Sequence, residues 1–113
     1  MDLNRSTLLG RLTQDPEIRT TASGQSVGNL RIATNRVWTD QSGVKQEKSE
    51  FHGCVVWGKL ADIVGQYLSK GRRVYVEGRL ETRDWTGQDG IKRYKTEIVV
   101  DNLIMLDGPR GSA

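Results

Sequence analysis

Apolar and polar residues alternate along five stretches of the sequence, which is the pattern of β-strands with one buried face. Clusters of Gly, Asn, Asp, Ser and Pro separate these stretches, and such residues favour turns. The pattern predicts five strands, over residues 3–12, 26–38, 50–59, 72–85 and 91–106. Residues 39–48 are polar except for Val44 and are expected to form a long loop, whereas residues 86–90 have the composition of a hairpin turn.

Residues 59–71 change to a helical period between the third and fourth predicted strands. Their apolar residues recur at i, i+3, i+4, i+7 and i+8, which gives one apolar stripe. The stripe consists of Leu60, Ile63, Val64, Tyr67 and Leu68. We expect it to cover an open end of the sheet, and we expect Gly71 to end the helix, since glycine readily takes the left-handed conformation.

Five strands with one helix between the third and the fourth is the element order of the OB-fold, a small Greek-key barrel. The predicted fold class is therefore all-β with one short helix, as a five-stranded Greek-key OB-fold barrel. A chain of 113 residues is long enough for one domain with its own core. We assign residues 1–106 to this domain and expect residues 107–113, which lack large apolar side chains, to be disordered.

The formal net charge is +3, and positive charge is concentrated in residues 70–95. This segment holds eight basic and four acidic residues, a net +4, which leaves −1 for the rest of the chain. Such a segment suits a polyanionic partner, although an ordinary solvated hairpin has a similar charge pattern. Charge alone does not choose between the two.

The sequence has one histidine and one cysteine, His52 and Cys54. Structural zinc sites use four ligands, mostly Cys and His, so we predict no metal site, and no cofactor is expected. The cysteine is expected to be a buried apolar side chain in a reducing compartment. No Gly-rich phosphate loop, paired-carboxylate motif or nucleophile elbow is present, so an enzyme is not expected. With no signal peptide and no apolar run long enough to span a membrane, the expected location is the cytoplasm.

The large aromatic side chains follow the strand period. Phe51 and Trp57 are six residues apart, so alternation places both on one face of the third predicted strand, with Gly53 and Val55. The opposite face carries His52, Cys54 and Val56. On the fourth predicted strand Arg79, Glu81, Arg83 and Trp85 share a face, and Gly78 is expected to mark a β-bulge.

Two interpretations of these rings remain open. Tryptophan is highly buried on average, so each ring could belong to the core. However, Trp38 ends the second predicted strand and Trp85 ends the fourth, and arginines accompany the rings. Exposed rings among cations are typical of proteins that bind single-stranded nucleic acid, because every base has a face on which a ring stacks.

Five segments carry a specific resemblance to known sequences. They read GRLTQDPEIR, ATNRVW, EFHGCVVWGKLAD, YLSKGRRVYVEGRLETRDW and YKTEIVV, at residues 10–19, 33–38, 50–62, 67–85 and 94–100. In this order they resemble the signature segments of the bacterial single-stranded DNA-binding protein family, and the resemblance covers residues 3–106. It implies a cytoplasmic, nucleoid-associated protein that binds and protects single-stranded DNA, largely independently of sequence, in DNA replication, recombination and repair.

The resemblance also implies roles for individual residues. The aromatic residues that would stack on bases are Trp38, Phe51, Trp57 and Trp85. The basic residues that would line the DNA path are Arg5, Arg19, Lys59, Lys70 and Arg83. His52 corresponds to a subunit contact, and the implied assembly is a homo-oligomer, specifically a tetramer.

The sequence departs from the family pattern at two places. Gly53 stands where many relatives have arginine, and Glu81 and Asp84 stand where some have cations, so the DNA path along the fourth strand is expected to differ. Family members usually continue through a Gly-, Pro- and Gln-rich linker to an acidic tip that recruits replication and repair proteins. This sequence has neither, and we expect such partners only where the full-length protein has that tip.

Two alternative functions fit the same fold. A primosomal accessory protein works mainly through protein contacts, and such a surface has no need of four rings interleaved with cations. An RNA-binding OB-fold protein is expected to carry clustered aromatics in a ribonucleoprotein-type motif, which the sequence lacks.

Overall fold

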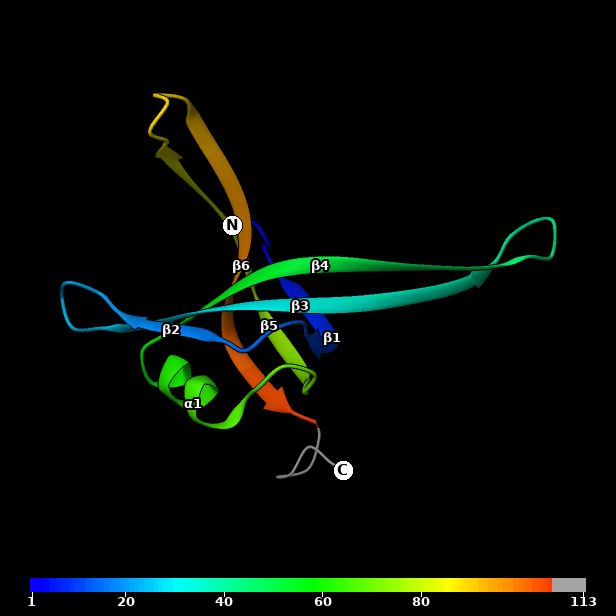
Figure 1. The fold of residues 1–113 in the computed structure, drawn as a ribbon, viewed down its shortest axis with the longest axis horizontal. Coiled ribbons are helices and arrows are strands. Elements are labelled where there is room, and N and C mark those ends of the chain that lie inside the picture. Colours follow the sequence, from blue (N-terminus) through cyan, green and yellow to red (C-terminus); the bar gives the residue numbers. More distant parts are fainter. Residues whose placement is uncertain (107–113) are drawn as a thin grey trace.

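The computed structural model describes residues 1–106, which form six strands and one helix (Figure 1). The expectation of disorder at residues 107–113 lies outside the described residues. The elements are β1 (Ser6–Leu12), β2 (Glu17–Thr20), β3 (Ser26–Thr39), β4 (Lys45–Trp57), α1 (Lys59–Tyr67), β5 (Arg73–Thr86) and β6 (Lys92–Met105).

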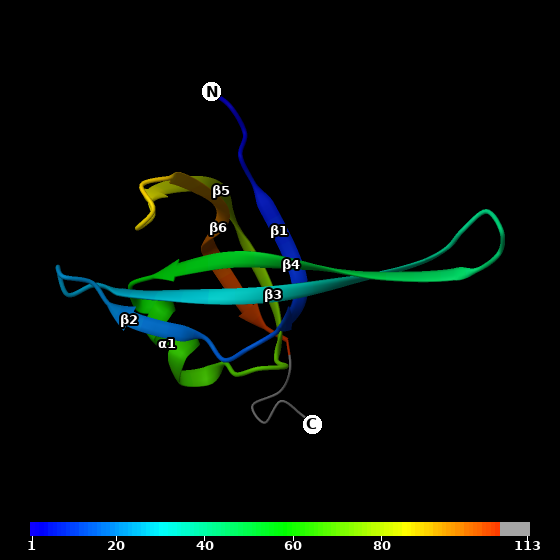
Figure 2. The ribbon, with the colours of Figure 1, turned by 45° about the horizontal axis from the view of Figure 1, so that its top comes forward.

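All strands except the short β2 close into a five-stranded barrel (Figures 1 and 2). The antiparallel pairs are β1 with β5, β5 with β6, and β3 with β4, whereas β4 and β6 run parallel. The barrel closes where Arg11 and Leu12 of β1 pair with Ala33 and Ile32 of β3. The helix lies between β4 and β5, the third and fourth strands of the barrel, so the predicted OB-fold is confirmed.

The core consists of side chains from the barrel strands and from α1, as the alternation predicted. Ile32, Val56, Val64, Val74 and Val76 are fully buried. The helix packs on β2, β3 and β4, and it covers one end of the barrel (Figure 2). Its apolar stripe is broader than the face it buries, because Ile63 and Tyr67 are exposed.

The prediction of a long polar loop at residues 39–48 is wrong. β3 continues to Thr39 and β4 begins at Lys45, so the two strands form an arm that extends beyond the barrel (Figure 1). Most side chains at this end of both strands are exposed, so the apolar alternation that marks a half-buried strand is missing. The Asp40 carboxylate stabilises the turn by accepting backbone N–H bonds from Ser42 and Val44, each at 2.9 Å.

Two smaller predictions also need correction. The short strand β2 was not predicted, because its four residues are exposed and follow a proline. The helix ends at Tyr67, and Leu68 is already extended, so Gly71 does not close it. Gly71 does adopt the left-handed conformation, with φ of 90°, but in the turn before β5.

The predicted bulge at Gly78 is present. The pairing of β5 with β6 shifts register between Glu77 and Gly78. A side chain at position 78 would collide with the carbonyl group of Val99, so the close approach of β6 requires glycine here. Beyond the bulge, β5 and β6 leave the barrel as a second arm (Figure 1).

Candidate nucleic-acid interface

The face of β4 predicted from the strand period lies on the surface of the barrel. Phe51 and Trp57 are 54% and 43% exposed, so neither ring is core. On the opposite face, Cys54 and Val56 are buried in the core. Burial raises the pKa of the Cys54 thiol to about 12, with a smaller contribution from the charge of Glu97, which makes this cysteine a neutral side chain.

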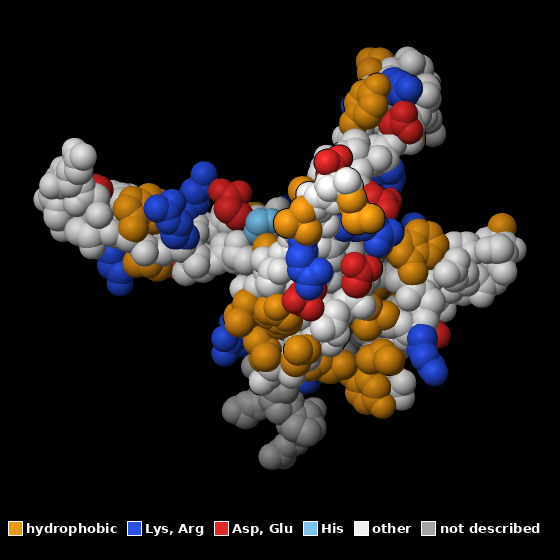
Figure 3. Space-filling model, turned by 180° about the vertical axis from the view of Figure 1, so that it is seen from behind, with side chains coloured by type: hydrophobic (Ala, Val, Ile, Leu, Met, Phe, Trp, Pro, Cys, Tyr) orange, Lys and Arg blue, Asp and Glu red, His pale blue; other side chains and the backbone are white. Residues whose placement is uncertain are grey.

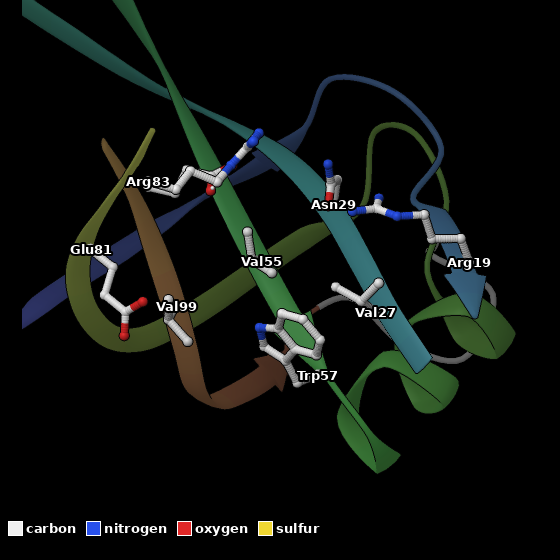
Figure 4. A pocket seen from close by; sticks show the side chains of 9 residues that line it. Arg19, Val27, Asn29, Val55, Trp57, Glu81, Arg83 and Val99 are labelled. Carbon is white, nitrogen blue, oxygen red and sulfur yellow. Dashed lines mark hydrogen bonds and ion pairs between the residues drawn. The ribbon is translucent and has the colours of Figure 1, made fainter. Parts of the chain in front are cut away.

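Trp57 lies in a pocket of about 350 Å³ on this surface (Figure 4). Val27, Val55 and Val99 provide apolar surface beside the ring, and Arg19 and Arg83 reach in from opposite sides. The lining residues come from five strands and are Arg19, Val27, Asn29, Val55, Trp57, Glu81, Arg83, Glu97 and Val99. The pocket combines an aromatic face and apolar walls with two guanidinium groups and the side chains of Glu81 and Glu97. The aromatic face and the apolar walls suit a flat ring, and Arg19 and Arg83 supply N–H donors for an attached anionic chain.

A buried carboxylate fixes one wall of this pocket. Glu97 on β6 is 7% exposed, and its carboxylate accepts a hydrogen bond from Arg83 Nε at 2.8 Å. Lys95 Nζ lies 3.8 Å from the other carboxylate oxygen. The sequence alone does not single out Glu97, although strand alternation from Val99 places it on the same face.

Phe51 lies in a neighbouring groove of about 400 Å³, which shares Asn29 with the Trp57 pocket. The Arg31 guanidinium lies over the Phe51 ring, 5.1 Å from its centroid. Gln14, Glu17, Gly53, Lys95 and Thr96 also line the groove. The sequence alone does not single out Arg31 or Lys95 as site residues.

The other two tryptophans lie on the arms and line neither of these pockets. Trp85 follows Arg83 on the same face of β5, and the two side chains stack at 5.0 Å. Trp38 lies near the end of β3, where Arg36 stacks on it at 4.7 Å. Ile32 pairs with His52, so these two side chains share a face of the ribbon, and Trp38 lies on that same face because it follows Ile32 by an even number of residues. Phe51 lies on the opposite face. Figure 3 shows Lys and Arg side chains spread along both arms.

Three of the predicted cations lie outside the two pockets. Arg5 forms an exposed ion pair with Glu77 at 3.2 Å. Lys59 is the first residue of α1, and Lys70 lies in the turn after the helix, where its backbone N–H donates to Asp15. The structure thus brings together Arg19, Trp57 and Arg83 and places Phe51 in the adjacent groove.

His52 lies on the inward face of β4 and is half-buried. One of its ring nitrogens, Nε2, is 2.8 Å from the Thr34 hydroxyl. Within residues 1–106, no group of three or more His, Cys, Asp and Glu side chains could hold a metal ion. Over the same residues, no helix has the length and apolar character needed to cross a bilayer.

Comparison with known proteins places this chain in a family. The model of the single-strand binding protein family matches residues 3–106. The chain belongs to this family. Among curated members, it is 55% identical over 105 residues to single-stranded DNA-binding protein 1 of Chlorobaculum tepidum and 44% identical over 108 residues to the single-stranded DNA-binding protein of Neisseria meningitidis. These alignments cover 92% and 96% of this chain but 65% and 62% of the two relatives, so the chain spans somewhat less than two thirds of their length.

Solved structures of family members share the fold. The SSB of Plasmodium falciparum, solved as a complex with ssDNA, is 35% identical and superposes with a TM-score of 0.87, covering 95% of this chain and 97% of that one. A deletion mutant of the single-stranded DNA-binding protein from Thermus aquaticus, also 35% identical, superposes with a TM-score of 0.82 over 94% of this chain and 51% of that one.

Proposed function

We propose that this chain binds and protects single-stranded DNA, largely independently of sequence and without catalysis, in DNA replication, recombination and repair. The observation that carries the proposal is the pair of half-exposed rings, Phe51 and Trp57, on one strand face with Arg19, Arg31 and Arg83 around them. Stacking of a base on such a ring contributes about 1–3 kcal/mol whatever the base. The cations supply contacts to the phosphates, which are present in every sequence.

The geometry favours a single strand over a duplex. The rings lie in open pockets on the barrel surface, where an unpaired base can place its face against them. In duplex DNA the base faces are already stacked on each other and are not available. The names of the two curated relatives, and the ssDNA in the Plasmodium falciparum complex, support the same choice.

We further propose that the chain forms a homo-oligomer, specifically a tetramer, with His52 at a subunit contact. Within the described residues, one edge of β1 pairs with β5, and the other edge pairs with β3 only at Arg11 and Leu12. Along Ser6–Leu9 this second edge has no strand partner. Leu9 on this segment is 51% exposed. Open strand edges are usually covered, and a second copy of the chain could pair with this edge.

The proposed role places the protein in the bacterial cytoplasm, associated with the nucleoid. Replication and repair proteins are proposed partners wherever the full-length protein carries an acidic tip. The DNA-binding surface described above lies entirely within the barrel and its arms, so binding of DNA does not depend on such a tip.

Binding of fluorescent oligo(dT), of a matched duplex and of matched RNA, each at several salt concentrations, tests the proposal. We expect oligo(dT) to bind much more tightly than the duplex and more tightly than the RNA. Equal or tighter binding of RNA would favour the RNA-binding alternative. No binding of any nucleic acid would favour a primosomal accessory protein that acts through protein contacts.

A further inference from the structure

The groove beside Phe51 contains two cations that flank a glycine. Arg31 on β3 is the direct cross-strand partner of Gly53 on β4. On the other side of β4, Lys95 of β6 reaches across the strand. Its Cε and Nζ would lie 3.5 Å and 3.7 Å from a Cβ atom at position 53. The Lys95 ammonium therefore lies over the space that a side chain at position 53 would occupy.

Both cations are oriented by neighbouring groups yet face the groove. The Arg31 guanidinium stacks over Phe51, which leaves its N–H edges for other contacts. Lys95 is 49% exposed, and its ammonium lies 3.8 Å from Glu97, which is beyond hydrogen-bonding distance. An ammonium has three N–H donors, so Lys95 can donate to a ligand in the groove while Glu97 restrains it electrostatically.

The groove suits one anionic group next to an aromatic ring. Of its described lining residues, Arg31 and Lys95 are cationic and Glu17 is anionic, so the lining carries a net charge of +1, and the Glu97 carboxylate lies 3.8 Å from the Lys95 ammonium. A phosphodiester carries one negative charge and lies one sugar away from a base. A base stacked on Phe51 would bring its phosphate within reach of both cations.

We propose that Arg31 and Lys95 form a phosphate subsite above Gly53, which binds the DNA backbone next to the nucleotide stacked on Phe51. This proposal rests on the proposed function and adds to it two contact residues. The absence of a side chain at position 53 is what allows cations from the two flanking strands to serve one phosphate.

The first test measures how oligo(dT) affinity depends on salt for Lys95→Gln and Arg31→Gln. On single strands, each phosphate contact contributes a slope of about −0.7 in log K against log salt. The slope of log K against log salt should therefore be shallower for each variant than for the parent, by about 0.7. Lys48→Gln is the matched control, because Lys48 also pairs with a glutamate two residues later, Glu50, but on the opposite face of β4.

The second test places a charge in the subsite itself. Gly53→Asp puts a carboxylate between the two cations, whereas Gly53→Asn adds a neutral side chain of the same size. The nearest contacts of a Cβ at this position have ordinary van der Waals distances, so both variants should fold. Gly53→Asp should weaken oligo(dT) binding at least tenfold relative to Gly53→Asn at low salt, and the difference should shrink at high salt.

The outcomes separate the two proposals. If the parent protein does not bind oligo(dT), the proposed function fails. If it binds but Lys95→Gln and Arg31→Gln keep the parent slope, the subsite is wrong and the function stands. An equal change in Lys48→Gln, or equal affinity of Gly53→Asp and Gly53→Asn, would also overturn the subsite.

Discussion

Arg83 Nε donates a hydrogen bond to Glu97 Oε1 at 2.8 Å, from β5 to β6, in the wall of the pocket that holds Trp57. The carboxylate side chain is 8% exposed and the arginine side chain is 54% exposed. A buried anion thus restrains a cation that also faces solvent. Glu97 orients Arg83, and its negative charge partly neutralises the cation that the proposed function assigns to a DNA phosphate.

Replacing Glu97 with Gln should increase the dependence of DNA binding on salt. Glutamine keeps the size and one acceptor oxygen but removes the charge that competes with phosphate for Arg83 and Lys95. The slope of log K against log salt for oligo(dT) should become steeper by up to about 0.7, with tighter binding at low salt. A shallower slope would mean that orientation of Arg83 by the full charge matters more than competition.

Replacing Trp57 with Ala should affect DNA binding more than folding. Loss of one stacking ring costs about 1–3 kcal/mol of binding free energy per site. A fully buried tryptophan would instead cost about 3–5 kcal/mol of unfolding free energy, and Trp57 is 43% exposed. Fluorescence titration with oligo(dT) and thermal unfolding measure the two quantities on one variant.

Tyr67→Ala is the control for this variant, because Tyr67 is an exposed ring on α1, outside the two pockets. It should bind DNA like the parent. Oligo(dT) should also strongly quench the tryptophan fluorescence of the parent, whereas a duplex should quench it little. A Trp57→Ala protein that melts far below the parent but binds at full affinity would contradict the proposed stacking role.

Lys59→Ala and Arg83→Ala should each make DNA binding less sensitive to salt. Each proposed phosphate contact releases condensed counterions, so its loss reduces the slope by about 0.7. Titrations of oligo(dT) from low to high salt give the slope directly. Affinity of the parent that stays flat with salt would rule out a cationic DNA path altogether.

A charged residue at position 52 should change the assembly and leave the DNA surface intact. His52 is half-buried on the face opposite to Phe51, so His52→Glu introduces a carboxylate at the proposed subunit contact. Light scattering at micromolar concentration should show smaller species than for the parent. A parent mass equal to the monomer mass of 12.7 kDa would refute the oligomer.

The Cys54 thiol should be unreactive in the folded protein. Burial raises its pKa to about 12, so almost no thiolate exists at pH 8, and the group is also inaccessible. A thiol reagent should react quickly only after denaturant is added. The unfolded thiol ionises near pH 9.0, so below that pH the protonated thiol makes its full contribution to the free energy of unfolding. This contribution is lost as the pH rises toward about 12, the pKa in the folded protein.

The sequence was sufficient for those parts of the site that depend on one strand at a time. Phe51 and Trp57 share an exposed face because the strand period is two and β4 has no bulge between them. Gly78 indicated the bulge in β5, and a glycine is required at this position because β6 leaves no room for a side chain there. In both cases the local pattern and the barrel impose the same arrangement.

The contributions from neighbouring strands could not be predicted, because they depend on register. Lys95 and Glu97 reach the site only because β6 lies between β4 and β5, with Glu97 opposite Glu81. Arg31 reaches Phe51 through the pairing of β3 with β4. The arm of β3 and β4 was missed for a different reason: a ribbon that is exposed on both faces has no apolar alternation.

The unbroken ladder of β3 and β4, from the pair Val27 and Trp57 to the pair Thr39 and Lys45, restricts how this arm can change length during evolution. Deleting one cross-strand residue pair (one rung) between Thr34 and Trp38 would move Trp38 to the face of Phe51. Deleting two such pairs would leave Trp38 on its present face. Rungs beyond Trp38 can be added or lost without this effect. Length variation among homologues should therefore concentrate at the tip of the arm, and changes nearer the barrel should occur in steps of two rungs.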